Sequence, residues 1–347
     1  MLKKIRKKKF FFSSMLNLLF LLIGYTSLVY ADAPSTQKIL FSSTRDGNWE
    51  IYMMNPDGSN QVNLTQHPSN DFEAVWSPTG EQILFVSDRG GKGIQDLYLM
   101  DSNGSNHRRV FKRKTNVDKR SPAWSPDGNQ YVFWSVNHDR HEYDLYLATF
   151  GDENVERLPY CMSPEWSPDG SEISCTVSHV SGRRLKYINL RTRKMEQPIR
   201  DKTLQWQNTP SWAKTGGRLA ISGNKHKIPV ELDRDLHNAW NDKTTIYIVN
   251  RDGTGLRQLV DEVGPPASIP EISPDGLELI YTQEIIGRQQ IFKLNINTGD
   301  RIQLTDTGAI SRQANIGGDW FDPAFKSLPV NPQTNQITST WGQLKMK

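Results

Sequence analysis

Short segments in which apolar and polar residues alternate recur along most of the chain, and turns rich in Gly, Pro, Asn and Asp separate them. Clear examples are the segments 82–87, 96–100 and 130–135, which are rich in aliphatic and aromatic residues. Alternation with a period of two is typical of half-buried β-strands. The pattern therefore predicts an all-β protein made of many short strands.

A repeated motif groups these strands into units of similar length. Each motif has one large anchor residue followed by Ser-Pro-Asp-Gly or a variant of it. Consecutive anchors lie 42 to 60 residues apart, and a four-stranded propeller blade takes about 40–50 residues. The repeat predicts a β-propeller with one blade for each anchor. The anchors are Trp76, Trp124, Trp166, Trp212, Ile272 and Trp320, the last in a degenerate copy.

The Ser-Pro-Asp-Gly sequence favours a tight turn directly after each anchor. Proline presets φ for the second position of a type I turn, aspartate suits the third, and glycine adopts the left-handed conformation that follows. Such a turn joins the first and second strands of a blade as a hairpin. We therefore expect each anchor on an innermost strand, packed between neighbouring blades rather than bound to a cofactor.

The first and last units of the chain are expected to form one blade together. The chain enters a strand at 38–43 without a preceding anchor, and strands at 49–54 and 61–65 follow. The missing innermost strand is supplied by 317–322, which contains the last anchor. Sharing a blade in this way removes an open sheet edge. The sequence thus predicts a six-bladed β-propeller whose first blade is completed by the C-terminal strand.

The repeats resemble those of the TolB family. The match rests on blade openings such as Pro-Ala-Trp-Ser-Pro-Asp-Gly at 122–128 and on segments such as Ile-Tyr-Met-Met-Asn-Pro-Asp-Gly-Ser at 51–59. It covers roughly residues 37–323. The family includes the periplasmic Tol–Pal translocation component, and similar propellers precede the hydrolase domain of dipeptidyl-peptidase-type serine peptidases.

Two departures limit what this resemblance implies about function. Only a few residues precede the first expected strand after a signal segment, so we do not expect the α/β domain that TolB carries before its propeller. The chain also has no G-x-S-x-G nucleophile sequence, the hallmark of an α/β-hydrolase serine. The resemblance therefore indicates the repeat more strongly than a Tol–Pal or peptidase role.

The N-terminus has the features of a secretory signal peptide. Six basic residues precede an apolar stretch that ends in Val29-Tyr30-Ala31, and we expect cleavage after Ala31. An uncleaved signal anchor is the alternative, because the apolar stretch is about as long as a membrane span. Without residues 1–31 the formal charge changes from +4 to −2, so the basic balance is no argument for nucleic-acid binding. We expect a periplasmic or secreted protein with no other membrane span.

The chain is accordingly divided into a signal peptide at 1–31, a propeller at 32–323 and a C-terminal tail at 324–347. The tail is Pro-rich and then polar, which suits an extended strap, an attachment segment or a disordered end. The fifth blade contains an insertion at 224–242 that is mixed in charge and has room for a short helix. Insertions in repeats often lie on a binding face, although a loop without a ligand is the equal alternative.

Cys161 and Cys175 fall on neighbouring strands of one predicted hairpin. In an oxidising compartment they can form a disulfide. Two buried thiols are the alternative interpretation.

No sequence motif identifies a chemical site, so candidate residues are named only by their face. Propeller ligands tend to bind where the fourth-to-first and second-to-third strand loops gather. The densest ionisable cluster there, at 138–144, can be a metal site or a solvated loop, and we favour the loop. We expect no metal, no cofactor and no catalytic residue. The candidates on this ligand face are Arg45, Asp46, Asp88, Arg89, His138, Arg140, His141 and His226.

The leading functional hypothesis is a monomeric, exported binding scaffold for a protein, peptide or glycan partner in the cell envelope, since a rigid ring that displays variable loops suits binding. One alternative is a propeller lyase or hydrolase that acts at the central channel through converging carboxylates or a metal. A second alternative is a structural component of an envelope assembly, with the tail as its tether.

Overall fold

The computed structural model describes residues 31–91, 93–179, 182–200, 203–215, 217–229, 234–306 and 313–327. The predicted signal peptide, most of the tail and part of the insertion lie outside the described residues. The described residues from Asp32 onward belong to one compact unit.

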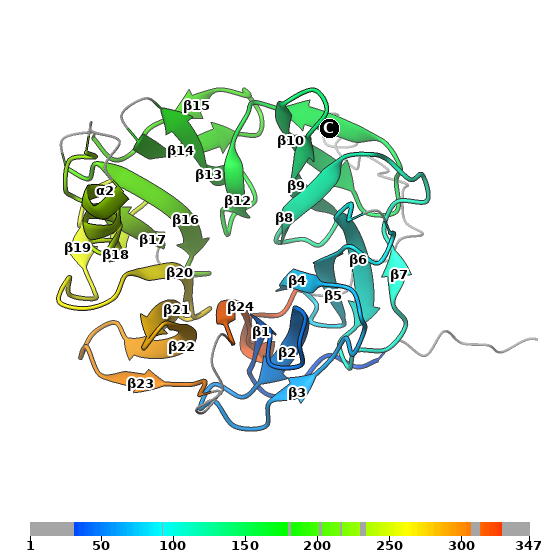
Figure 1. Cartoon of the computed structure of the whole chain (residues 1–347). Coiled ribbons are helices and arrows are strands. Elements are labelled where there is room, and N and C mark those ends of the chain that lie inside the picture. Colours follow the sequence, from blue (N-terminus) through cyan, green and yellow to red (C-terminus); the bar gives the residue numbers. More distant parts are fainter. Residues whose placement is uncertain are drawn as a thin grey trace, which may run out of the picture. The chain divides into compact units, whose positions relative to one another are not determined.

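Six four-stranded antiparallel sheets make up this unit and follow one another around a ring (Figure 1). This confirms the predicted all-β, six-bladed propeller. The strands that line the centre of the ring are the first of each blade, β4, β8, β12, β16, β20 and β24 (Figure 1).

The first three blades contain the following strands. Blade 1 has β24 (Asn315–Phe321), β1 (Lys38–Ser43), β2 (Glu50–Met54) and β3 (Val62–Asn63). Blade 2 has β4 (Asp71–Trp76), β5 (Gln82–Ser87), β6 (Asp96–Asp101) and β7 (Arg108–Arg109). Blade 3 has β8 (Asp118–Trp124), β9 (Gln130–Asn137), β10 (Glu142–Thr149) and β11 (Val155–Leu158).

The other three blades repeat the same order. Blade 4 has β12 (Met162–Trp166), β13 (Glu172–His179), β14 (Gly182–Asn189) and β15 (Met195–Glu196). Blade 5 has β16 (Trp206–Trp212), β17 (Arg218–Asn224), the helix α2 (Arg234–Asn241), β18 (Thr245–Asn250) and β19 (Arg257–Gln258). Blade 6 has β20 (Ala267–Ile272), β21 (Glu278–Ile285), β22 (Arg288–Asn295) and β23 (Arg301–Gln303), and the short helix η1 (Pro323–Phe325) follows β24.

The turn has the predicted form after four of the anchors, Trp76, Trp124, Trp166 and Ile272, whereas the short helix η1 follows Trp320. In blade 3, the Gly128 N–H donates to the Ser125 carbonyl at 2.9 Å, and the Ser125 N–H donates to the Gln130 carbonyl at 2.8 Å. Gly128 has a φ of 72°, which glycine adopts without steric cost. The Asp127 carboxylate accepts from the Ser125 hydroxyl at 2.6 Å and from the Asn129 N–H at 3.0 Å. Each residue type of the motif therefore has a place in the turn.

The anchors pack between neighbouring blades, as predicted. The Trp166 indole N–H of blade 4 donates to the Ala123 carbonyl of blade 3 at 3.1 Å. Trp76 of blade 2 packs against Phe321 of blade 1, with 5.4 Å between the ring centroids. All six anchor side chains are buried, so burial of large apolar surface holds each blade against the next.

The two ends of the propeller meet in blade 1. β24 pairs with β1 in an antiparallel register that places Lys38 opposite Phe321 and Ile39 opposite Trp320. The predicted closure is therefore confirmed. The closing strand begins two residues earlier and ends one residue earlier than the predicted 317–322.

Cys161 and Cys175 form a disulfide, with 5.7 Å between their Cα atoms. Cys175 lies on β13, and Cys161 directly precedes β12 in the same blade. The bond closes a loop with a sequence separation of 14. A crosslink over a loop of this size stabilises a fold by about 3 kcal/mol, mainly through the unfolded chain.

The insertion of blade 5 contains the expected short helix, α2. The Trp240 indole N–H donates to the His226 carbonyl at 3.0 Å, and the Asn224 amide donates to the Trp240 carbonyl at 2.6 Å. Trp240 also meets Trp206 edge to face at 6.2 Å. The described part of the insertion is thus fastened to the start of an inner strand. Nowhere in the described ranges is a helix long and apolar enough to cross a membrane.

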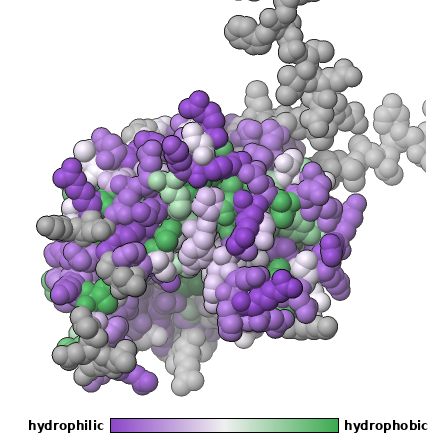
Figure 2. Space-filling model, turned by 90° about the horizontal axis from the view of Figure 1, so that it is seen from above, coloured by the Kyte–Doolittle hydropathy of each residue, from purple (hydrophilic) through white to green (hydrophobic). Residues whose placement is uncertain are grey.

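The outer side of the ring is mostly hydrophilic in the view of Figure 2, where hydrophobic residues are scattered among polar ones. Apolar side chains dispersed in this way are normal for a protein surface. The side seen in this view therefore offers no continuous apolar docking patch.

Candidate functional site

A bulge at the same place in all six inner strands sets the geometry of the ring centre. The register between the inner strand and its neighbour shifts within each blade. One residue of each bulge, three positions before the anchor, has a positive φ, from 45° at Thr209 to 67° at Gly317. A bulge bends its strand and redirects the side chains that follow. The residues bearing the positive φ are Glu73, Ser121, Ser163, Thr209, Ile269 and Gly317.

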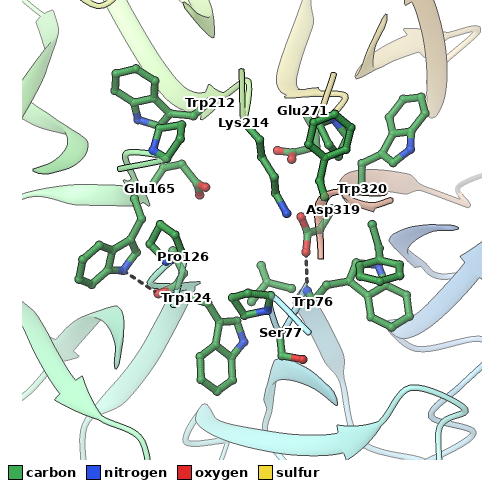
Figure 3. Close-up of a pocket in the computed structure, with 18 of the residues that line it drawn as sticks. Trp76, Ser77, Trp124, Pro126, Glu165, Trp212, Lys214, Glu271, Asp319 and Trp320 are labelled. Carbon is green, nitrogen blue, oxygen red and sulfur yellow. Dashed lines mark hydrogen bonds between the residues drawn. The ribbon is translucent and has the colours of Figure 1, made fainter. Parts of the chain in front are cut away.

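The residue directly before each anchor faces the ring centre, because neighbouring residues of a strand point to opposite sides. The anchor points between blades, so its predecessor points to the channel. Figure 3 shows Glu165, Glu271 and Asp319 reaching toward one another from three inner strands. Blade 5 has Ser211 at the equivalent position, and blades 2 and 3 have Val75 and Ala123.

Two cavities meet at these carboxylates, each of about 310 Å³. Both are lined by Val75, Glu165, Glu271 and Asp319. One cavity extends along the starts of the inner strands and includes several bulge residues. The other, drawn in Figure 3, extends past the anchors to the Ser-Pro turns and is lined by five tryptophans. We call this second space the turn-side cavity and the carboxylates at its base the acidic arc (Glu165, Glu271 and Asp319).

Burial and mutual repulsion disfavour ionisation of the acidic arc. Burial, with a contribution from the charge of Asp319, raises the pKa of Glu165 to about 8. Burial and the charges of Asp319 and Glu165 raise the pKa of Glu271 well above its usual value. Burial also raises the pKa of Asp319 to about 6, although an N–H donated by the Trp76 backbone opposes this shift. Glu165 and Asp319 thus lose their protons over different pH ranges.

Lys214 reaches toward the acidic arc from the rim of the turn-side cavity (Figure 3). It occupies the position of the proline in the turn after Trp212. Its positive charge lowers the pKa of all three carboxyls, against the larger effect of burial. Four of the other five blades have a proline at this position, and blade 1 has Asp322. All four prolines line the same cavity: Pro78, Pro126, Pro168 and Pro274.

The segment after β24 crosses the rim of the turn-side cavity. Phe325 of η1 and Ser327 line the cavity. The Ser327 N–H donates to the Pro78 carbonyl of blade 2 at 2.9 Å, and its hydroxyl donates to the Pro126 carbonyl of blade 3 at 2.6 Å. Residues 323–327, which include the described start of the tail, are thus bound across two blades as a strap. We call it the rim strap.

A fourth carboxylate, Glu73, lies in the other cavity, at the bulge of blade 2. Its carboxylate accepts a hydrogen bond from the Ser121 N–H of blade 3 at 2.6 Å. Burial raises its pKa. Glu73 therefore joins two blades, as Asp319 of the acidic arc does through the Trp76 N–H.

The eight predicted ligand-face residues lie in loops and line neither cavity. In blade 1, the Arg45 guanidinium binds Gln61 and Asn315 at 2.7 and 3.0 Å and lies over the Tyr52 ring at 4.4 Å. Asp46 accepts hydrogen bonds from Tyr52 and from Asn63. These two residues therefore brace their own blade.

The candidates of blade 2 also have partners within the fold. Arg89 forms an ion pair with Asp71 at 2.7 Å. Asp88 accepts from the backbone and side chain of Asn70 at 3.0 and 2.8 Å. The carboxylate of Asp88 thereby fixes the loop that enters β4.

The remaining candidates lie on the tips of blades 3 and 5. His138 contacts Asp118 at 2.9 Å, and His226 contacts Glu262 at 2.8 Å. Arg140 and His141 are exposed at the hairpin tip, where His141 has a φ of 53°. Within the part of the chain that the structure describes, no group of three or more His, Cys, Asp or Glu is placed to hold a metal ion. The structure does not bring the eight candidates together at one point.

Sequence reasoning missed the acidic arc and Lys214 because it searched the loops. The signal was present: Glu165, Glu271 and Asp319 each directly precede an anchor, and Lys214 replaces a proline of the motif. Comparing the residue directly before the anchor in all six repeats would have placed the three carboxylates on one wall of the channel.

Comparisons with known proteins show similarity to TolB in sequence and in fold. A family model described as the TolB beta propeller domain matches residues 29–145. A protein named Protein TolB homolog, from Chlorobium luteolum, is 30% identical over 139 residues, which is 40% of this chain and 27% of that protein. A Tol-Pal system protein TolB from Desulfosudis oleivorans is 39% identical over 62 residues, 18% of this chain and 14% of that protein. The chain thus spans about a quarter or less of the length of these relatives.

Solved structures share the fold at low sequence identity. The crystal structure of TolB from Acinetobacter baumannii matches with a TM-score of 0.67 and 14% identity, over 82% of this chain and 66% of that one. Kuenenia stuttgartiensis hydrazine synthase matches with a TM-score of 0.63 and 13% identity, over 86% of this chain and 48% of that one. Proteins with such different names share this fold, so the fold alone assigns no activity.

Proposed function

We propose that this β-propeller with TolB-like repeats is an exported scaffold that binds a protein or peptide partner in its central channel. The observation that carries the proposal is the turn-side cavity, where aromatic and proline side chains surround a few converging polar groups. Binding sites in proteins commonly combine an apolar wall with a small number of placed polar groups.

The surrounding structure supports binding in the channel rather than at the loop tips. Six of the eight loop candidates have side-chain partners within the fold. The acidic arc, by contrast, faces a cavity that is open to a ligand. A rigid ring also holds such groups in place, which lowers the entropic cost of ordering them on binding.

Site-specific photocrosslinking tests this proposal. Phe325 lines the turn-side cavity, so a benzoylphenylalanine replacing it presents a reactive ring there with little change in shape. We expect a defined protein adduct in cell envelopes from this position and none from the matched position Ile302, which is exposed on the outermost strand of blade 6. Equal adducts from both positions, or thermal shifts with glycans alone, would contradict a protein partner in the channel.

A second candidate function, an acid–base enzyme, is favoured by one observation. The acidic arc combines a carboxyl whose pKa is raised to about 8 with one raised to about 6. At neutral pH the first holds a proton and the second is mostly ionised, which is the arrangement of a general acid beside a general base. This is the lyase or hydrolase alternative, with carboxylates in place of a metal.

Turnover measurements separate the two functions. If the channel is catalytic, Glu165→Gln and Asp319→Asn each abolish release of product from an active substrate in a panel of esters, glycosides and uronides. Glu284→Gln, on an exposed site of β21, serves as the control. If the unmodified chain turns over no substrate of the panel, the enzyme function is rejected and the binding function remains.

A further inference from the structure

The acidic arc and Lys214 together form an unbalanced charge cluster. Three carboxylates face one ammonium group across the base of the turn-side cavity (Figure 3). At neutral pH Glu165 holds its proton. A bound cation would lower the pKa values of the arc and release protons from it, and the fully ionised arc with Lys214 then carries a net charge of −2. A buried charge is stable only when a partner of opposite charge or a hydrogen-bond donor compensates it. The described residues therefore leave room for one more positive group at this point.

Lys214 itself is poorly suited to be a permanent partner of the arc. It lies on a turn at the cavity rim, and its side chain is exposed. A lysine side chain is a flexible stem with a compact, strongly hydrated charge. It can leave the cavity for solvent at low cost, because solvent hydrates the ammonium group fully. Replacing the proline of the motif by lysine thus placed a movable cation at the mouth of an acidic cavity.

The cavity wall fits a second cation of the same kind. Trp76, Trp124 and Trp166, whose rings are buried between the blades, border the space above the arc. The prolines of the rim add apolar surface that suits the methylene stem of a lysine or arginine side chain. An anionic or purely apolar ligand would leave the arc uncompensated.

We infer that the partner inserts a cationic group, a lysine or arginine side chain or a free N-terminal amine, between Glu165, Glu271 and Asp319, and that Lys214 occupies this place when the partner is absent. This inference rests on the proposed function and names the chemistry that the channel recognises. Lys214 is then a built-in competitor: it screens the arc in the free protein and lowers the affinity for every cationic ligand.

Selection from a phage-displayed library of short random peptides tests the inference on the mature chain, residues 32–347. Peptides are selected separately on the wild type and on Lys214→Ala, and the enriched sequences are synthesised. Binding is measured through the fluorescence of the channel tryptophans. We expect enriched peptides to contain Lys or Arg and to bind Lys214→Ala about tenfold more tightly than the wild type, since an internal competing charge has been removed.

Charge-neutral variants of the arc provide the opposite change. Glu165→Gln/Glu271→Gln should weaken the same peptides about tenfold or more. Lys114→Ala and Glu284→Gln, which change exposed residues outside the cavity, should leave binding unchanged. Lys214→Pro restores the residue of the other turns and should act like Lys214→Ala, which separates loss of the charge from a local change of the turn.

The outcomes distinguish failure of the inference from failure of the proposed function. Peptides that bind the channel but lack a cationic group, or that bind Lys214→Ala no better than the wild type, overturn the inference and leave the channel as a binding site. If no enriched peptide responds to any cavity variant while all variants remain folded, both the channel as a peptide site and the inference fail.

Discussion

The two halves of the channel wall are built on the same backbone and carry opposite chemistry. Blades 2 and 3 place Val75 and Ala123 directly before their anchors, whereas blades 4, 6 and 1 place Glu165, Glu271 and Asp319 there. The bulge and its positive φ recur in both halves. The symmetric repeat therefore fixes where a side chain points, and the departures from symmetry decide what the channel can bind.

The apolar half can be tested by adding a fourth carboxylate to the ring. Ala123 is buried, 3% exposed, and its carbonyl accepts the Trp166 indole N–H. Ala123→Glu introduces a carboxylate at a buried site next to the Trp166 indole, so we expect a loss of about 3–5 kcal/mol in unfolding free energy. Urea denaturation measures this loss, with Ala123→Ser as the control. An unchanged midpoint would show that both halves tolerate charge and that the asymmetry has no energetic basis.

The disulfide distinguishes one blade of the acidic half from its apolar neighbour. Blade 4 contains both Glu165 and the Cys161–Cys175 bond. Cys161→Ser/Cys175→Ser should lower the unfolding free energy by about 3 kcal/mol, the value for a loop of this size. Urea denaturation with and without a reductant checks it, because the reductant should affect the wild type and not the variant. If reductant does not change the unfolding free energy of the wild type, the disulfide does not stabilise this half.

The pH dependence of stability is expected to come from the acidic half. Its carboxyls have raised pKa values, about 8 for Glu165 and about 6 for Asp319. The folded state therefore binds protons more tightly than the unfolded chain. The stabilisation is complete below the ordinary carboxyl pKa and is lost as the pH rises through about 6 to 8. Glu165→Gln/Glu271→Gln should raise Tm at pH 8 by about 2 °C or more, with little change at pH 5.

Thermal scans between pH 5 and pH 9 measure this difference, and Glu284→Gln is the matched surface control. Equal slopes of Tm against pH for the wild type and the double variant would contradict the raised pKa values of the arc.

The rim strap gives the smallest expected effect and belongs to the apolar half. Ser327 bonds to Pro78 and Pro126, which lie in the two blades with an apolar residue directly before the anchor. Ser327→Ala removes the hydroxyl donor to Pro126, so we expect a loss of about 1 kcal/mol or less. It should also increase acrylamide quenching of the channel tryptophans. Unchanged quenching would mean that the strap does not limit access to the turn-side cavity.

Most of the fold could be predicted from the sequence because local chemistry determines it. The Ser-Pro-Asp-Gly turn and its anchor recur with little change, and the absence of an anchor before Lys38 was enough to predict the shared blade. Strand ends were less certain, as in β24, because the bulge before Trp320 adds a residue that an alternating pattern does not show.

The site was harder to predict because it is assembled from residues far apart in the sequence. Glu165 and Asp319 are ordinary acidic residues in their local sequence, and only closure of the ring brings them to one wall. Charged loop residues such as Arg89 attracted attention instead, yet ion pairing within the fold accounts for Arg89. The insertion of blade 5 contains a helix as expected, but its described part contacts Trp206 at 6.2 Å rather than the channel.

The pairing of β1 with β24 makes the order of synthesis matter. Lys38 is among the first propeller residues to leave the ribosome, and its partner Phe321 is among the last. Until then β1 presents an unpaired edge and the acidic arc lacks Asp319. Blades 2 to 6 can form as the chain emerges, but the last joint waits for the final strand, as expected for a long-range contact that closes late. An incomplete chain therefore exposes the unpaired edge of β1, which the complete ring covers. This edge distinguishes the two states for proteases and chaperones.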